Sequence, residues 1–474
     1  GSNQFLFQWF ALALVKIYTM QWETLFSNKR YGSRNLQNKD ETRGEYLRDY
    51  DRLIFSSQFR RLQDKTQVFP LPGSVFVHNR LTHSLEVASV GRSLGRLVGE
   101  KIAKKNAQKL SKNAQEFYRF GLSDVIQTGC IAHDIGNPPF GHSGEDAIRT
   151  FFMELSAEHK AILNKDLSTN QFNDLKNFEG NANAFRVLSS VFLKAGLKLT
   201  YTTLASVVKY PVDSTHGFDK ESGLVSTKKS GYFDAELPVM KEMAKDLQMT
   251  YLDKDKNLLA RHPFVFLVEA ADDICYRIID LEDAYRLHIL TFDEVAGLLI
   301  PFFEGESNEA YIKEQMTEMK DEKQKISLLR AMLIGLLTRK CSEAFMANEK
   351  ALLAGDVNKS LVELIDIKSI ALMNQIDAIS IDKIYNHQSV IEIEIAGFHV
   401  IGGLLKEFLG AILDPQSVKS KKLKKLVPQQ FDLSDGLGLY LNILSIIDFI
   451  SGMTDIYAVD LYRKITGIQI PSLR

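Results

Sequence analysis

A histidine and an aspartate stand next to each other, as His133 and Asp134, where a helical pattern breaks off. Apolar and small side chains recur at helical spacing over residues 122–130, so His133 continues the inward face of the predicted helix. The run Gly-Asn-Pro-Pro at residues 136–139 then ends that helix. A ring nitrogen and a carboxylate oxygen at one helix end can point at one centre, which makes this pair candidate metal ligands.

Two further residues with ligand chemistry lie on inward faces of other predicted helices. The apolar stripe that follows His83 at helical spacing consists of Val87, Val90, Leu94 and Leu97. Asp272 shares a stripe with Val268 and Tyr276, whereas the adjacent Asp273 is rotated away by about 100°. A buried carboxylate needs a charged partner. His83 and Asp272 are therefore candidate partners for the first pair of ligands.

The order of these residues resembles the H…HD…D signature of the HD-domain metal phosphohydrolases. Several flanking segments are similar to the bacterial dGTP triphosphohydrolases, which are related to the mammalian SAM-and-HD-domain dNTPase: residues 59–70, 79–84, 133–145, 178–182, 209–211 and 451–455. The resemblance runs from about residue 20 to the C-terminus. It implies that His83, His133, Asp134 and Asp272 bind a divalent metal ion. Mn²⁺ or Mg²⁺ is the first expectation, and Fe²⁺, Co²⁺, Zn²⁺ and Ni²⁺ are alternatives.

His142 and Glu145 lie three residues apart on the first turn of the next predicted helix. A histidine held by a carboxylate beside a phosphate suits general acid or nucleophilic catalysis. The resemblance implies that this pair is catalytic, with His142 protonating the leaving 5′-oxygen or acting on the attacking water. Ser143 and Asp146 are interpreted as an ordinary capping box.

The resemblance also implies contacts with the substrate before the first histidine. Gln67 precedes a predicted Pro-Gly turn at residues 70–73, where its amide can donate to and accept from a sugar hydroxyl. A plain surface glutamine is the alternative, and the resemblance favours a deoxyribose contact for Gln67 with Val68. Arg80 lies three residues before His83 and leans over the same turn, as a phosphate clamp would.

The remaining predicted substrate contacts come from two later segments. Lys209 and Tyr210 end a helical pattern at a proline, and by resemblance Lys209 contacts a phosphate. Tyr276 and Asp280 follow Asp272 at i+4 and i+8 on one helical face. The resemblance implies that the tyrosine packs on the sugar or base and that Asp280 binds the 3′-hydroxyl. Taken alone, they would be read as a core tyrosine and a surface acid.

The predicted reaction is hydrolysis of dGTP or other dNTPs to the deoxynucleoside and inorganic tripolyphosphate, which would regulate dNTP pools. The chain has no glycine-rich P-loop, which argues against cleavage between the β- and γ-phosphates. Some members of the resembling family need one dNTP to activate cleavage of another, so a dNTP effector is among the partners that the resemblance implies. The alternatives are another HD phosphohydrolase, such as a nucleotidase or phosphodiesterase, and a slow sensor of nucleotides or single-stranded DNA.

Composition sets the broad class. The 474 residues carry a formal net charge of −1, so no global field indicates nucleic acid binding. A run of lysines at residues 419–425 is typical of a surface loop and could alternatively contact single-stranded DNA.

The three cysteines are odd in number and resemble small core residues, which predicts a reducing, cytoplasmic location. The apolar run at residues 5–15 is too short to span a membrane, and residues 1–19 are interpreted as a tag remnant and an extension.

The expected fold is mostly α. An HD-domain helical core spans residues 20–290, with an irregular excursion at 212–258 where any strands should lie. Residues 291–474 form further helices packed on this core, including long patterns at 326–344 and 398–411. A homo-oligomer, tetramer or hexamer, is expected by resemblance. The arginines of residues 30–52 belong to a solvated surface or face a nucleotide phosphate across a subunit contact.

Overall fold

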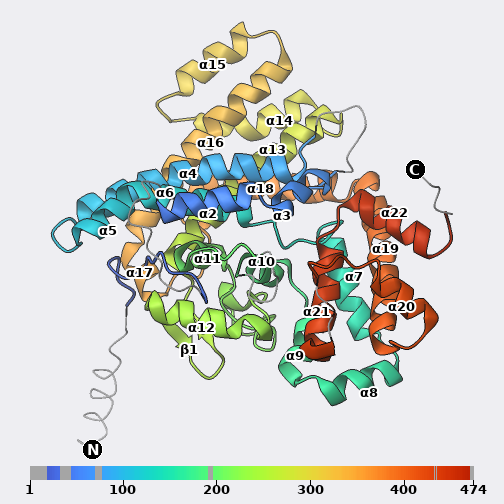
Figure 1. Ribbon diagram of the computed structural model, residues 1–474. Coiled ribbons are helices and arrows are strands. Elements are labelled where there is room, and N and C mark those ends of the chain that lie inside the picture. The colour runs from blue at the N-terminus through green and yellow to red at the C-terminus, as the bar shows by residue number, and fades with distance from the viewer. Residues whose placement is uncertain are drawn as a thin grey trace, which may run out of the picture.

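The computed structural model describes residues 19–32, 44–69, 77–189, 196–431, 433 and 435–469. Helices dominate these residues, and the only sheet among them is a short antiparallel pair of strands (Figure 1). The prediction of a mostly α fold is confirmed. The first eighteen residues, the predicted turn at 70–73 and two of the arginines, Arg34 and Arg43, lie outside the described residues.

The centre of the fold is a pair of closely packed helices, α4 (Arg80–Lys105) and α6 (Leu122–Ala132). Glycines one turn apart on α4 let them approach: a Cβ at Gly91 would lie 2.3 Å from Sγ of Cys130, and one at Gly95 would lie 2.9 Å from Cα of Ser123. Helix α13 (Pro263–Arg286) packs against both. The three helices that carry the predicted ligands therefore meet in the core.

Shorter helices surround this centre. Among the described residues, those that come before α13 in the chain are α2 (Glu45–Ile54), α3 (Ser57–Arg60), η1 (Arg61–Asp64), α5 (Lys112–Glu116), η2 (Phe117–Gly121), α7 (His142–Met153), α8 (Ala157–Asp166), α9 (Thr169–Lys176), α10 (Gly180–Ser189) and α11 (Tyr201–Val207). The side chain of Arg30 is 8% exposed and ion-pairs with Asp49 and Glu45 of α2, and Arg48 pairs with the same Glu45. These arginines are thus bound within the chain.

The excursion between α11 and α13 contains η3 (Val225–Thr227), η4 (Asp234–Glu236), α12 (Leu237–Asp246) and the strands β1 (Tyr251–Asp253) and β2 (Leu258–Leu259). The prediction that strands would lie at 212–258 is confirmed, with β2 running one residue further. Cys130, Cys275 and Cys341 are buried and free, as expected of core residues.

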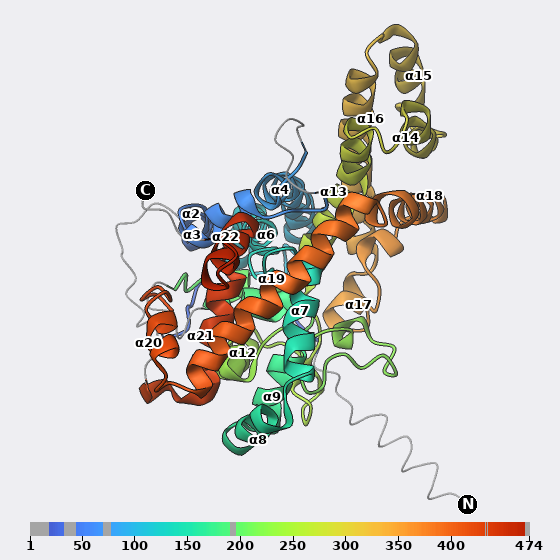
Figure 2. The same ribbon diagram turned by 90° about the vertical axis from the view of Figure 1, so that its right-hand side faces the viewer.

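The chain after α13 forms two parts. The first comprises α14 (Phe292–Leu299), η5 (Ile300–Phe303), α15 (Glu309–Glu318), α16 (Glu322–Ala347), α17 (Glu349–Ala354), η6 (Leu361–Glu363), α18 (Ile367–Ile379) and η7 (Ser380–Tyr385). One end of α16 projects away from the body together with α14 and α15 (Figure 2). Elsewhere α16 packs on α4 and α13.

The second part comprises α19 (Gln388–Leu413), α20 (Val418–Lys424), η8 (Asp435–Leu437), α21 (Gly438–Ser451) and α22 (Asp455–Ile465). Helix α19 lies along α7, and together with α21 and α22 it encloses a second apolar core. By length and composition alone α19, with a mean hydropathy of 1.4 over its most apolar window, could cross a membrane, as buried helices of folded proteins also could. The expected long helices at 326–344 and 398–411 are confirmed as parts of α16 and α19.

The prediction that the lysine run forms a loop is wrong. Residues 418–424 are helix α20, capped by the Ser417 hydroxyl, which accepts a hydrogen bond from the Ser420 amide. Lysine is a good helix former, and Ser420 and Leu423 bury one side of the helix while the lysines stay in solvent.

Candidate metal centre and active-site cavity

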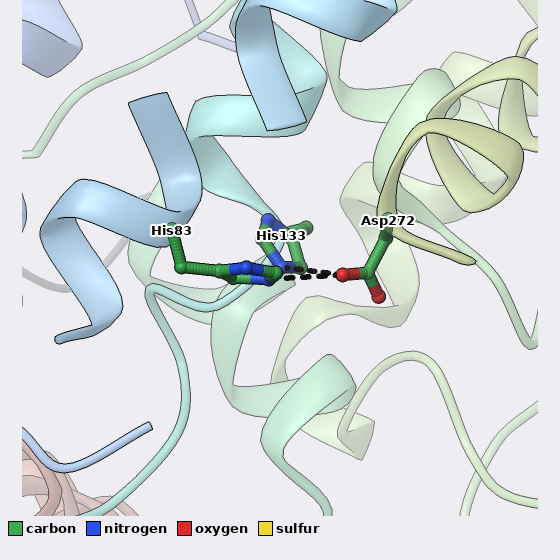
Figure 3. Close-up of side chains that lie close together, drawn as sticks. All are labelled: His83, His133 and Asp272. Carbon is green, nitrogen blue, oxygen red and sulfur yellow. Dashed lines mark hydrogen bonds and ion pairs between the residues drawn. The ribbon is translucent and has the colours of Figure 1, made fainter. Parts of the chain in front are cut away.

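Three of the four predicted ligands converge on one point. The ligand atoms of His83, His133 and Asp272 all lie within 4.8 Å of one another (Figure 3). Nε2 of His83 is 3.0 Å from Oδ1 of Asp272, and Nε2 of His133 is 3.4 Å from the same oxygen. Two imidazoles and a carboxylate aimed at one point are a donor set that divalent transition metals, including Mn²⁺, accept.

The second ring nitrogen of His133 fixes which nitrogen can bind a cation. His133 caps the C-terminal end of α6, and its Nδ1 lies 2.6 Å from the carbonyl oxygen of Cys130. Donation from Nδ1–H leaves a lone pair on Nε2, facing Asp272. Burial lowers the pKa of His133, but the nearby carboxylates of Asp134 and Asp272 outweigh this effect and raise its pKa to about 9. Burial also opposes ionisation of Asp272, yet the two imidazoles hold its pKa well below the ordinary value. The residues therefore fit a bound divalent cation.

Asp134 lies at the edge of this group. Its Oδ2 is 3.6 Å from Nε2 of His133 but only 2.8 Å from a guanidinium nitrogen of Arg80, and its Oδ1 accepts a hydrogen bond from the side-chain amide of Asn137. Arg80 is itself 6% exposed. The carboxylate thus neutralises Arg80 here, and its role as a fourth ligand remains a prediction.

A cavity of about 640 Å³ opens over this centre. Every predicted site residue except His83 lines it: Gln67, Val68, Arg80, His133, Asp134, His142, Glu145, Lys209, Tyr210, Asp272, Tyr276 and Asp280. Its volume falls in the usual range for small-ligand sites. The structure therefore brings together residues spread over more than two hundred positions of the chain.

His142 stands at the start of α7 with its ring 80% exposed, whereas Glu145 beneath it is buried. Nδ1 of His142 is 3.1 Å from Oε2 of Glu145, and Oε1 of Glu145 accepts the amide of Gly180 at 2.9 Å. The bond to Glu145 raises the pKa of His142. Burial raises the pKa of Glu145, but the bond to His142 outweighs it and leaves that pKa below the ordinary value. An imidazole whose protonated form is stabilised in this way, and which lines the cavity, is suited to proton donation.

The capping-box interpretation of Ser143 is wrong. Gly141 is the N-cap of α7, at φ 59°, and no side chain caps the helix there. The Ser143 hydroxyl instead donates to the carbonyl oxygen of Glu394 on α19. The helix begins at His142, one residue before the predicted cap, so Ser143 lies inside its first turn and cannot be the N-cap.

Lys209 lines the cavity but is paired. Its Nζ is 3.2 Å from Oε1 of Glu269, whose other oxygen is 2.7 Å from the buried guanidinium of Arg261. Burial lowers the pKa of Lys209, but the nearby carboxylate of Glu269 outweighs burial and raises this pKa, so the charged form of the lysine is stabilised. A phosphate at this position would compete with Glu269 for the ammonium group.

Tyr276 and Asp280 lie on the cavity side of α13, as the helical spacing predicted. Tyr276 is covered by the guanidinium of Arg277, 4.7 Å from its ring centre. Asp280 is 4% exposed and accepts a hydrogen bond from the Tyr385 hydroxyl at 2.8 Å. Burial raises the pKa of Asp280 to about 7. This acid is therefore not a surface residue.

Gln67 presents an unpaired acceptor. Its Oε1 is buried and has no hydrogen-bond partner among the residues that the structure describes. Gln67 and Val68 both line the cavity. A buried polar oxygen without a partner is costly, so a donor from a bound molecule would be favourable here.

Several lining residues were not among the predicted ones. Lys229, from the excursion, donates to Glu179 at 3.0 Å, and Asn181 donates to the same carboxylate at 2.7 Å. Glu269 belongs to this group as well, and Tyr385 and Glu394 come from the C-terminal part. The adjacent lysines Lys228 and Lys229 could be noticed in the sequence, but nothing there indicated that Lys229 pairs with Glu179. No sequence pattern around Tyr385 or Glu394 indicates that these residues line a cavity.

The chain is similar in sequence to known proteins over most of its length. A family model described as the HD domain matches residues 80–179. The chain is 38% identical over 463 residues to a protein of Synechocystis named deoxyguanosinetriphosphate triphosphohydrolase-like, covering 95% of this chain and all of that one. A protein of the same name from Pseudomonas aeruginosa is 38% identical over 96% of this chain and all of its own length. A Yersinia pestis protein named deoxyguanosinetriphosphate triphosphohydrolase is 30% identical, covering 89% of this chain and 93% of that one.

Proposed function

Because the chain belongs to the family of HD-domain deoxyguanosinetriphosphate triphosphohydrolase-like proteins, we propose that it is a metal-dependent dNTP phosphohydrolase that converts dGTP to deoxyguanosine and inorganic tripolyphosphate. One observation supports this proposal most directly. Of the three residues that could hold a cation, His133 and Asp272 line one cavity with the His142–Glu145 pair and with three cationic side chains, and the His83 ring nitrogen lies 3.0 Å from Asp272. Such a cavity combines the parts that phosphoester hydrolysis needs.

His83, His133 and Asp272 would hold the metal ion, with Asp134 as the fourth ligand. A bound Mn²⁺ or Mg²⁺ supplies Lewis-acid polarisation of a phosphate oxygen and lowers the pKa of water. Nδ1 of His133, fixed by the carbonyl of Cys130, keeps the liganding nitrogen aimed at the site.

The triphosphate would bind the three permanently charged cations of the cavity lining, Arg80, Lys209 and Lys229. Each of these is paired with a carboxylate, namely Asp134, Glu269 and Glu179. Phosphate oxygens form charge-assisted bonds of the same type, so the lysines and the arginine can exchange one anionic partner for another.

His142 would protonate the 5′-oxygen of the departing deoxynucleoside. His142 lines the cavity with its side chain 80% exposed while Nδ1 is held by Glu145, so Nε2 is the nitrogen that would meet the substrate. Glu145 stabilises the protonated ring and sets its orientation. We assign the alternative role, action on the attacking water, to the same nitrogen.

The nucleoside would be recognised by the remaining lining residues. Gln67 offers a buried carbonyl oxygen to a sugar hydroxyl, with Val68 beside it. Tyr276 would pack on the sugar or base, and Asp280 would accept the 3′-hydroxyl. Tyr210 lies next to Lys209 and completes this wall.

We also infer a cytoplasmic enzyme that regulates dNTP pools as a homo-oligomer, with dNTP activation as part of its control. An exposed apolar stripe on α19 supports subunit contacts: Ile391 is 40% exposed, Ile395 56% and Phe398 39%. Binding of single-stranded DNA has weaker support, from the exposed lysines of α20.

The test is the product released from each of the four dNTPs, singly and in pairs, with Mn²⁺ or Mg²⁺ and with GTP as the ribonucleotide control. We expect tripolyphosphate from dGTP, little from GTP, and none from either His142→Ala or Asp272→Ala. Pairs that react when single dNTPs do not would establish an activating site. Orthophosphate or pyrophosphate as the direct product, or no turnover in any mixture, would refute the proposed function in favour of another HD phosphohydrolase or a sensor.

A further inference from the structure

Asp455 joins two segments of the cavity wall that are far apart in sequence. Its Oδ2 accepts the backbone amide of Thr66 at 2.9 Å, and its Oδ1 accepts the backbone amide of Phe140 at 3.0 Å. The carboxylate is 6% exposed. Thr66 precedes Gln67 and Val68, and Phe140 lies two residues before His142. One side chain thus bonds to the substrate-binding segment and to the segment that aims the catalytic histidine.

A buried lysine makes a second link between the same regions. Nζ of Lys65 donates to the carbonyl oxygen of Asn137 at 2.6 Å and to that of Ser451 at 2.7 Å. Lys65 is 2% exposed. The turn between α21 and α22, residues 451–455, is therefore bonded through both of its ends to the cavity wall.

Asp455 is not used to cap its own helix. The N-cap of α22 is Thr454, whose hydroxyl accepts the amide of Tyr457 at 3.2 Å. The carboxylate of Asp455 points instead at the two loop amides. This arrangement distinguishes Asp455 from an ordinary acid at a helix start, whose contribution is to the helix itself.

The segment that Asp455 binds needs support. Phe140 has φ 62°, in the left-handed region that costs a bulky residue of order 1–3 kcal/mol and persists only when the surroundings hold it. Packing supplies part of the support, because a Cβ at Gly397 of α19 would lie 2.5 Å from the Phe140 side chain. The bond from the Phe140 amide to Asp455 supplies the other part.

We propose that Asp455 is a positioning residue for the reaction, which acts through Phe140 on His142 and through Thr66 on Gln67, with Lys65 as its companion. The expected effect of Asp455 on the reaction rests on the proposed function. Displacement of a catalytic group by about 1 Å costs as much as 100-fold in rate. Loss of the Asp455 bonds therefore affects kcat through His142 and KM through Gln67.

The experiment compares Asp455→Asn and Asp455→Ala with the intact chain. Asparagine keeps one acceptor oxygen and turns an NH₂ group toward the second amide, so it retains about half of the link. We expect kcat to fall by about 10-fold in Asp455→Asn and about 100-fold in Asp455→Ala, with KM raised in both. Hydrogen exchange, followed by mass spectrometry, should accelerate in peptides covering residues 62–69 and 136–144.

Asp174→Asn is the matched control for general loss of stability. Asp174 is also a buried carboxylate that accepts a backbone amide, that of Asp234 at 2.8 Å, but it does not line the cavity. Its variant should keep the kcat and KM of the intact chain.

Unchanged exchange in both peptides, or faster exchange with normal kcat and KM, would overturn the inference. If the intact chain releases no tripolyphosphate, the proposed function fails. The positioning role is then decided by the affinity for a dGTP analogue with a methylene in place of the 5′-oxygen. Weaker analogue binding in both Asp455 variants, but not in Asp174→Asn, supports the role, and equal binding overturns it.

Discussion

The bond between His142 and Glu145 can be tested by replacing each partner and then both. In Glu145→Gln the amide oxygen can still accept the Gly180 amide, which leaves the NH₂ group facing Nδ1 of His142. Nδ1 must then act as an acceptor, so the ring becomes neutral and its proton moves to Nε2. The variant keeps the shape of the site and removes the stabilisation of the protonated imidazole.

The expected magnitude follows from this geometry. A hydrogen bond to a charged group contributes about 1.5–3 kcal/mol, or roughly 10- to 150-fold in rate. Because the His142 ring is 80% exposed, solvent weakens the bond, and we expect the lower part of that range, a fall of about 10- to 30-fold in kcat. His142→Ala removes the proton donor altogether and should cost about 10²- to 10⁴-fold.

The assay is tripolyphosphate release as a function of pH for the intact chain, the two single variants and the double variant. If His142 donates a proton, activity is lost as pH rises through the pKa of His142. Glu145→Gln removes the carboxylate that raises this pKa, so the loss of activity should begin at a lower pH in this variant. The double variant should be no slower than His142→Ala, since the pair acts as a unit.

Asp146→Asn provides the control, as it removes a 59% exposed acid from the same helix. An equal slowing by Glu145→Gln in the presence and absence of His142 would refute the reasoning, as would an unmoved alkaline limb.

Two further predictions concern the metal centre and the buried acids. Saturating Mn²⁺ should raise the Tm of the intact chain, with about 2.7 kcal/mol gained at 100 times Kd, and scanning fluorimetry should show no rise for Asp272→Ala. An equal rise in the variant would remove Asp272 from the site. Burial raises the pKa of Glu236 to about 7, so its favourable contribution to folding is complete below the unfolded pKa and is lost as pH rises through 7. The free energy of unfolding of the intact chain, from urea titrations, should fall relative to that of Glu236→Gln between pH 5 and pH 8, and a constant difference would contradict this.

Helical periodicity was sufficient to predict that three of the candidate metal ligands lie close together. His83 and Asp272 lie on inward helix faces, His133 caps the end of another helix, and these three helices pack against one another. The same spacing predicted that Tyr276 and Asp280 share the side of Asp272. What it could not predict was the partner of each charged group, since Arg80 and Lys209 find their carboxylates through tertiary contacts.

The residues that sequence reasoning missed come from segments whose position depends on the whole fold. Tyr385 reaches Asp280 across 105 positions of the chain, and Glu394 lines the cavity because α19 lies along α7. No local pattern in residues 380–394 indicates a cavity. The interpretation of Ser143 failed for a related reason: the left-handed pair Phe140 and Gly141 shifts the helix start, and that turn is held by a residue 315 positions away.

The balance of charge on the cavity wall bears on why a metal ion is needed. The lining contains the acids Asp134, Glu145, Glu179, Glu269, Asp272, Asp280 and Glu394, against the permanent cations Arg80, Lys209 and Lys229. Even with Asp280 partly protonated through its raised pKa, acids outnumber cations. A triphosphate entering such a cavity would be repelled unless further positive charge accompanied it. A divalent ion at His83, His133 and Asp272 would supply that charge, and under the proposed function it would serve the binding of the nucleotide as well as the chemical step.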